Sequence, residues 1–147
     1  MNAEDRTLRT SRTLPVPPDA VYGAFAVPEV LASWWGPDGF TNTFDVFDFK
    51  VGGRWKFVMH GPDGRNYPNE NVFAVLEPGR RVVIRHDCAP YFTLEVQLAP
   101  ATEGTHLSWE QIFDDARTAQ AIRHIVGPAN EQNIDRMVRV LTGKGAA

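Results

Sequence analysis

The chain has 147 residues, of which 43% are hydrophobic and 22% are charged, and its formal net charge at pH 7 is -3. This composition is typical of a globular domain that is large enough to bury a core, and it excludes an intrinsically disordered chain. The negative charge argues against nucleic acid as a partner, because surfaces that bind phosphate are usually basic.

Cysteine content and hydropathy restrict the setting of the protein. Cys88 is the single cysteine, so no internal disulfide can form, and no apolar run reaches the length of about 18 residues that crosses a bilayer. The N-terminal residues are polar and lack the apolar segment of a signal peptide. We therefore expect a cytoplasmic protein without membrane insertion. Residues 1–147 are treated as one domain, because the sequence contains no repeat, low-complexity tract or linker.

The first elements along the chain are a strand and two short helices. Apolar and polar residues alternate from residue 6 to residue 16, as in a half-buried strand. Pro17-Pro18-Asp19 favours a helix start, because a proline lacks only an N–H that the first turn does not need and Asp19 suits the positive end of the helix dipole. Pro28-Glu29 begins a second helix, which Gly36-Pro37 ends.

Trp34 and Trp35 stand where the second helix is forced to end. Neighbouring helical residues point about 100° apart, so the two rings are not expected to face one surface. We predict that one ring is deep in the core and that Trp35 lies near an edge, beside a cavity. The alternative is that both rings fill the junction between helix and sheet, because large aromatic side chains dominate core burial.

Six further stretches alternate in the same way and predict an antiparallel sheet with short connections. They cover residues 41–49, 54–60, 67–76, 81–87, 91–98 and 105–113. Turn sequences separate them, among them Gly52-Gly53 and Gly61-Pro62-Asp63-Gly64. Together with the first stretch, the pattern predicts a sheet of seven strands.

The C-terminal region predicts helix in two pieces. Residues 116–126 form a short helix, Gly127-Pro128 breaks it, and a longer helix follows over residues 128–141. Ile134, Met137, Val138 and Leu141 make a single apolar stripe on this longer helix. A curved sheet is the natural partner for that stripe, so the predicted fold class is α+β.

Several short motifs occur in an order that resembles one known superfamily. They are Pro17-Pro18-Asp19-Ala20-Val21-Tyr22, Pro28-Glu29, Trp34-Trp35-Gly36-Pro37, residues 49–53 with Trp55, Gly61-Pro62-Asp63-Gly64 with Tyr67, Glu77-Pro78 and Gly104-Thr105. Over nearly the whole chain, their order is similar to that of the SRPBCC, or START-like, superfamily. Their spacing resembles the AHSA-like branch, which is named for homologues of the heat-shock-protein-90 ATPase activator.

The resemblance implies a helix-grip fold. In this fold a strongly curved antiparallel sheet wraps a long C-terminal helix, two short helices follow strand one, and a cavity lies between sheet and helix. One departure concerns the glycine before the last helix, which relatives often follow with an aromatic residue, whereas Pro128 follows Gly127 here. The shape of the pocket near that helix start is therefore expected to differ from that of relatives.

Our first functional hypothesis is the binding of a small hydrophobic, aromatic or lipid-like molecule in this cavity. Aromatic and methionine side chains share strand faces that carry few polar residues, as in apolar ligand sites. In this hypothesis the Asn130 amide forms one oriented hydrogen bond with the ligand. The alternative is that Asn130 caps the helix or is exposed to solvent. Alternatively, the aromatic rings fill the space and leave a solid core. The candidate ligand-binding residues are Trp35, Trp55, Phe57, Met59, Phe73, His86, Trp109, Asn130 and Ile134.

The second hypothesis is an enzyme that uses the same cavity, because the resemblance includes cyclases and hydrolases of polyketide-like or aromatic substrates. The acid–base candidates are His60, His86, His106, Asp48 and Glu110. Of these, His86 shares a strand face with Val82 and Ile84 and is expected to point inward. The sequence contains no nucleophile elbow, zinc motif or phosphate-binding loop, so the catalytic residues stay unknown, and we expect no metal and no cofactor.

The third hypothesis is contact with a chaperone, which rests on the name of the branch. The activator that gives the branch its name has a further N-terminal domain, whereas this chain begins almost directly at its first predicted strand, which counts against the hypothesis. The sequence leaves open the identity of the ligand and the choice between monomer and homodimer.

Overall fold

The computed structural model describes residues 3–143, which form one short 3-10 helix, seven strands and three α-helices. Their bounds in chain order are η1 Ala3–Arg6, β1 Thr7–Leu14, α1 Pro18–Ala26, α2 Pro28–Trp34, β2 Thr41–Phe47, β3 Arg54–His60, β4 Asn66–Glu77, β5 Arg81–His86, β6 Phe92–Ala101, β7 Gly104–Phe113 and α3 Ala116–Thr142. The seven predicted strands and the two short helices are all present, with ends that move by a few residues.

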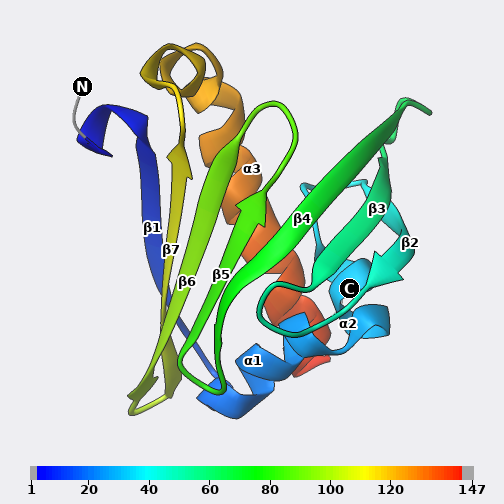
Figure 1. Cartoon of the computed structure of the whole chain (residues 1–147). Helices are drawn as coiled ribbons and strands as arrows, with labels where there is room; N and C mark the ends of the chain where they lie inside the picture. Colours follow the sequence, from blue (N-terminus) through cyan, green and yellow to red (C-terminus); the bar gives the residue numbers. More distant parts are fainter. Residues whose placement is uncertain (1–2, 144–147) are drawn as a thin grey trace.

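The strands form one antiparallel sheet in the order β1-β7-β6-β5-β4-β3-β2. The first strand pairs with the last, from Thr7 opposite Ile112 to Leu14 opposite Thr105. All other pairs join strands that follow one another in the chain, as short turns between alternating stretches require. Figure 1 shows the sheet curving around α3, with α1 and α2 at one end. The predicted α+β helix-grip class is therefore confirmed.

The C-terminal helix differs from its prediction, because α3 continues through Gly127-Pro128 instead of breaking there. Proline removes one backbone hydrogen bond and costs a helix interior about 3 kcal/mol, but apolar contacts on both sides of Pro128 hold the helix together. Ala119 packs before the proline, and Ile134 and Met137 pack after it. Figure 1 shows the first turns of α3 lying at an angle to the rest, as expected for a proline kink.

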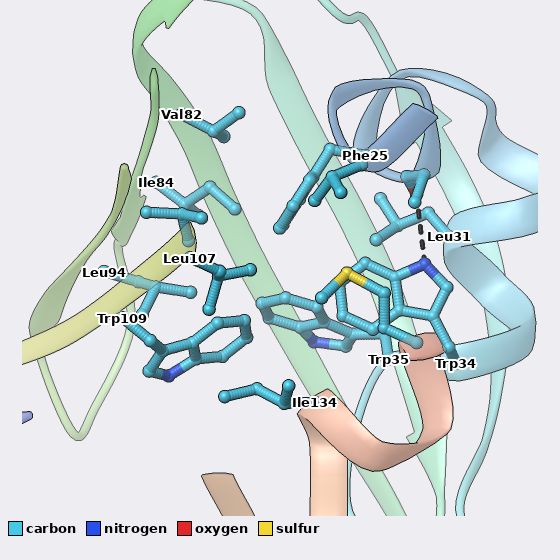
Figure 2. Close-up of a cluster of buried hydrophobic side chains, with 14 of the residues drawn as sticks. Phe25, Leu31, Trp34, Trp35, Val82, Ile84, Leu94, Leu107, Trp109 and Ile134 are labelled. Carbon is cyan, nitrogen blue, oxygen red and sulfur yellow. Dashed lines mark hydrogen bonds between the residues drawn. The ribbon is translucent and has the colours of Figure 1, made fainter. Parts of the chain in front are cut away.

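The core contains a dense aromatic cluster at the end of the sheet that α1 and α2 cover. The ring of Trp34 meets Phe25 edge to face with centroids 5.1 Å apart, and its Nε1 donates to the Ala24 carbonyl oxygen over 3.0 Å (Figure 2). Trp55 and Phe73, both fully buried, stack with centroids 5.9 Å apart. This part of the interior is filled by rings.

The two tryptophans are both buried, with exposed fractions of 0% for Trp34 and 8% for Trp35, so the prediction that only one lies deep was wrong. The helical angle of about 100° does not apply to this pair, because α2 ends at Trp34 and Trp35 is extended, with φ -66° and ψ 132°. The rings meet edge to face with centroids 5.7 Å apart. Trp35 does lie beside a cavity, as predicted.

Candidate ligand-binding cavity

A cavity of about 200 Å³ lies between the sheet and the middle of α3. Strands β3 to β7 each contribute one or two side chains to it, and the loop after α2 closes one side. The lining residues are Trp35, Gly36, Pro37, Phe57, Met59, Asn69, Asn71, His86, Phe92, Leu94, Trp109, Gln111, Val126, Ala129, Asn130 and Asn133. Half-buried residues such as Pro37, Asn69 and Ala129 form its rim, whereas the inner wall is buried.

Six of the nine predicted ligand-binding residues line this cavity, namely Trp35, Phe57, Met59, His86, Trp109 and Asn130. The other three, Trp55, Phe73 and Ile134, are fully buried in the core and are not part of the lining. Trp55 packs against Trp35 with ring centroids 4.9 Å apart, and so lies behind the ring that borders the space. The sequence pattern correctly predicted that the side chains of Trp55, Phe73 and Ile134 point into the core. The inward-facing side of the sheet and of α3 extends beyond the cavity, so these three residues lie outside the lining.

Four polar residues of the lining were not predicted from the sequence, namely Asn69, Asn71, Gln111 and Asn133. Asn69 and Asn71 share the β4 face of Phe73, and Gln111 shares the β7 face of Trp109, so strand alternation alone points them inward. On α3, Asn133 lies three residues after Asn130 and thus on a neighbouring position of the same side. The alternation of residues along β4 and β7 was the signal that could have identified these polar residues. It was not used because an apolar pocket was expected.

Aromatic rings form two walls of the cavity. The ring of Trp35 lies between Trp55 and Trp109, with its centroid 6.3 Å from that of Trp109. Figure 2 shows these two lining indoles reaching toward each other from opposite sides of the core. His86 and Phe92, which are paired across β5 and β6, stack at a centroid distance of 4.4 Å and an angle of 19°. The walls therefore suit a flat, apolar molecule.

His86 is held as a neutral ring. Its Nδ1 lies 2.8 Å from Asn71 Oδ1, which can only accept, so Nδ1 carries the proton and donates. Its Nε2 lies 3.4 Å from the Cys88 thiol. Burial, with a smaller effect of the Arg85 charge, lowers the pKa of His86 from 6.5 to about 4. At neutral pH this side chain adds no charge to the cavity.

The loop after α2 is fastened to α3 and so fixes one side of the cavity. The Gly36 N–H donates to Asn133 Oδ1 over 2.8 Å. Gly36 has φ +98°, a backbone conformation that is strained for residues with a side chain, so the position favours glycine. The Arg136 guanidinium donates over distances of 2.8 to 3.3 Å to five backbone carbonyls, those of Ser33, Trp35, Gly36, Pro37 and Phe40.

Three of the five side-chain amides of the lining accept a hydrogen bond from the protein with their oxygens. Asn71 accepts from His86, Asn133 accepts from Gly36, and Gln111 Oε1 accepts from Asn130 Nδ2 over 3.0 Å. Four buried side-chain atoms of the described residues have no hydrogen-bond partner, and solvent reaches none of them: Asn42 Oδ1, Trp55 Nε1, Trp109 Nε1 and Asn133 Nδ2. A buried polar group left unpaired costs about 1–3 kcal/mol, and two of these atoms belong to residues of the lining, whereas Asn42 and Trp55 lie outside it.

The lining carries no charged side chain, since it contains no Asp, Glu, Lys or Arg. Across residues 3–143, no group of three or more His, Cys, Asp or Glu side chains gathers in a way that could hold a metal ion. None of the helices described has both the length and the apolar character needed to cross a membrane. The cavity is thus a neutral site with polar groups of the amide, indole and imidazole types.

The curved sheet that grips α3, with a cavity between them, defines a helix-grip domain of the SRPBCC, or START-like, superfamily. At the level of sequence, the profile of the family described as "Activator of Hsp90 ATPase homolog 1-like protein" matches residues 15–142. The chain belongs to this family, and the resemblance of its motifs is confirmed.

Solved structures share this fold. A protein from Nitrosomonas europaea is 20% identical, with 98% of this chain and 99% of that one covered and a TM-score of 0.87. A protein from Chromobacterium violaceum is 27% identical, with 91% of this chain and 96% of that one covered and a TM-score of 0.80. An AHSA1-like protein from Aeromonas hydrophila is 22% identical, with 95% of this chain and 94% of that one covered and a TM-score of 0.76. A search among curated proteins found no match. The family supports a domain of ligand-binding type.

Proposed function

We propose that the protein binds a small, flat and largely apolar molecule in the cavity between the sheet and α3. The observation that carries the proposal is a space of about 200 Å³ bordered by the rings of Trp35, Phe57, Phe92 and Trp109. Empty volume in a core destabilises a protein by about 24 cal/mol per Å³. A cavity of this size therefore lowers the free energy of unfolding by several kcal/mol at most. This cost in stability supports a ligand-binding role for the cavity.

The volume limits the size of the ligand. An apolar cavity of about 150 Å³ binds benzene, whereas sites for drug-sized ligands span about 300–1,000 Å³. A space of about 200 Å³ fits one aromatic ring with a short substituent. Lipids and polyketides require more room, so the smaller of the predicted ligand classes is the one we propose.

The state of His86 supports binding rather than acid–base catalysis. A catalytic acid or base works best with a pKa near the operating pH, but burial lowers the pKa of His86 to about 4. Both ring nitrogens already contact protein atoms, and Phe92 covers one face of the ring. In the proposed function His86 is part of a flat wall.

Two one-ring probes test the proposal, namely acetophenone and its hydrocarbon isostere α-methylstyrene. We expect at least one of them to bind in calorimetry and to raise the unfolding temperature with increasing concentration, because a ligand of the folded state stabilises it. Benzophenone, which adds a second ring to acetophenone, should bind more weakly. No binding of either one-ring probe at millimolar concentration would contradict the proposal.

A variant of α3 locates the binding. Ala129→Leu places a larger apolar side chain at a lining position and should lower the affinity for the probe by about tenfold or more. The matched control is Ala121→Leu, at an exposed position of the same helix outside the lining. Equal affinities of the two variants would place the probe elsewhere on the protein.

A further inference from the structure

We propose that Arg136 sets the upper size limit of the ligand, because it holds the loop between α2 and β2 against α3. This inference rests on the proposed function and deepens it by naming a residue that decides which ligands fit. Arg136 does not line the cavity, so it is a positioning residue that acts through the loop, residues 35–40. Its guanidinium prevents this wall from yielding to a molecule larger than one ring.

The loop is the one irregular part of the cavity wall among the residues that the structure describes. It contributes Trp35, Gly36 and Pro37 to the lining, whereas every other lining residue belongs to a strand or to α3. Strands and helices are held by regular backbone hydrogen bonds. Within residues 35–40, the backbone makes a single hydrogen bond, from the Phe40 N–H to the Pro37 carbonyl over 3.2 Å. The shape of the loop therefore depends on side chains from other elements.

Arg136 contributes more to the loop than any other of these side chains. Its two terminal nitrogens contact five backbone carbonyl oxygens over 2.8 to 3.3 Å. Four of these oxygens belong to the loop, namely those of Trp35, Gly36, Pro37 and Phe40. Asn133, Gln132 and Asn42 each add one hydrogen bond to the loop backbone. Loss of Arg136 would therefore remove most of the side-chain hydrogen bonds that hold the loop.

The part of α3 that carries Arg136 gives the loop a firm support. Ile134 and Met137, which flank Arg136 in the sequence, are fully buried in the core. Figure 1 shows α2, which leads into the loop, beside this C-terminal half of α3. A guanidinium suits the role, because its five N–H donors lie in one fixed plane and reach several carbonyls at once. The loop is thus held to an element that is itself well packed.

A firmly held loop limits the size of the ligand. The cavity of about 200 Å³ has room for one ring, so a second ring requires the wall to move outward. The sheet and the aromatic cluster behind Trp35 resist such a change, because closely packed interiors deform little. The part of the wall that can shift is the rim at Gly36 and Pro37. In the wild-type protein that shift breaks hydrogen bonds to Arg136.

Arg136→Met tests the inference, since it keeps an unbranched side chain and removes all five hydrogen bonds. The affinities of acetophenone and benzophenone for the full chain are measured by calorimetry. The wild type should bind acetophenone tighter, and the variant should shift the ratio of the two affinities toward benzophenone by about tenfold or more. Arg136→Lys should shift it less, because an ammonium has three donors. An unchanged ratio in Arg136→Met, or tighter binding of benzophenone by the wild type, overturns the inference.

Arg12→Met is the matched control. Arg12 also joins α3 to another element, through Glu131 and Asp135, but it touches neither the loop nor the cavity lining. This variant should keep the wild-type ratio of affinities. An equal shift in both methionine variants would indicate a general loosening of the protein and would contradict the role of Arg136. If Arg136→Met does not fold, Arg136→Lys decides, and an unchanged ratio there overturns the inference.

Amide hydrogen exchange shows whether the loop carries the effect. The Gly36 N–H, which donates to Asn133 over 2.8 Å, should exchange about tenfold faster or more in Arg136→Met and at the wild-type rate in Arg12→Met. A shifted affinity ratio with unchanged exchange contradicts a role through the loop. No binding of either one-ring probe to the wild type contradicts the proposed function itself, whereas binding without a shift contradicts this inference alone.

Discussion

The two sides of the Trp35 ring differ in how the interior is filled. On one side, Trp34, Trp55 and Phe73 belong to a cluster of fully buried rings. On the other side lies a cavity of about 200 Å³, and four of the six buried polar side chains among the described residues line it. These four are Asn71, His86, Gln111 and Asn133. Buried polar side chains thus gather where packing is incomplete, and this distinguishes the cavity from the filled core.

The largest expected effect is loss of a ring from the filled side. Phe73→Ala should lower the free energy of unfolding by about 3–5 kcal/mol, because the surrounding rings cannot collapse into the space left. Met59→Ala removes a half-buried side chain that borders the cavity and should cost less than half as much. Urea unfolding of both variants measures the difference. Equal losses would mean that the two sides are packed alike.

Acid should act on the cavity side through His86. An unfolded histidine takes up a proton near pH 6.5, whereas His86 resists protonation until about pH 4. Between these values the unfolded state binds more protons, so the stability falls as the pH falls. The shift corresponds to a loss of roughly 3 kcal/mol by pH 4, and no loss through this group is expected above pH 7.

The matched variant for this pH effect is His86→Gln, which cannot titrate. Its free energy of unfolding, measured with urea from pH 7 down to pH 4, should decline less steeply than that of the wild type. Phe73→Ala, on the filled side, should decline in parallel with the wild type. Parallel curves for wild type and His86→Gln would show that the pKa of His86 is not lowered by folding.

The smallest expected effect is a difference between two Trp→Phe variants. Trp34→Phe leaves the Ala24 carbonyl without its 3.0 Å donor, whereas Trp109 Nε1 has no protein partner to lose. We expect Trp34→Phe to be less stable than Trp109→Phe by about 1–2 kcal/mol, the cost of an unpaired buried acceptor. Thermal and urea unfolding without ligand provide the comparison. The reverse order would mean that Trp109 Nε1 is already satisfied in the free protein.

Most of the fold could be predicted because its signals are local. Alternation over a few residues marked each strand, and prolines at the helix starts marked α1 and α2. The cavity was predictable only in part. Strand parity found the rings of Phe57 and Trp109, but it does not tell where along a strand the filled core ends, so Trp55 and Phe73 were placed in the lining with them.

The sequence by itself determined the order of the elements and the faces of the strands, since both depend on neighbours within a few residues. The tertiary structure alone decided that α3 passes through Pro128, that both tryptophans are buried, and that several side-chain amides gather around the cavity. Each of these depends on groups far apart in the chain. Asn133 owes its orientation to Gly36, which lies 97 residues earlier, and no pattern within a window of the sequence encodes that contact.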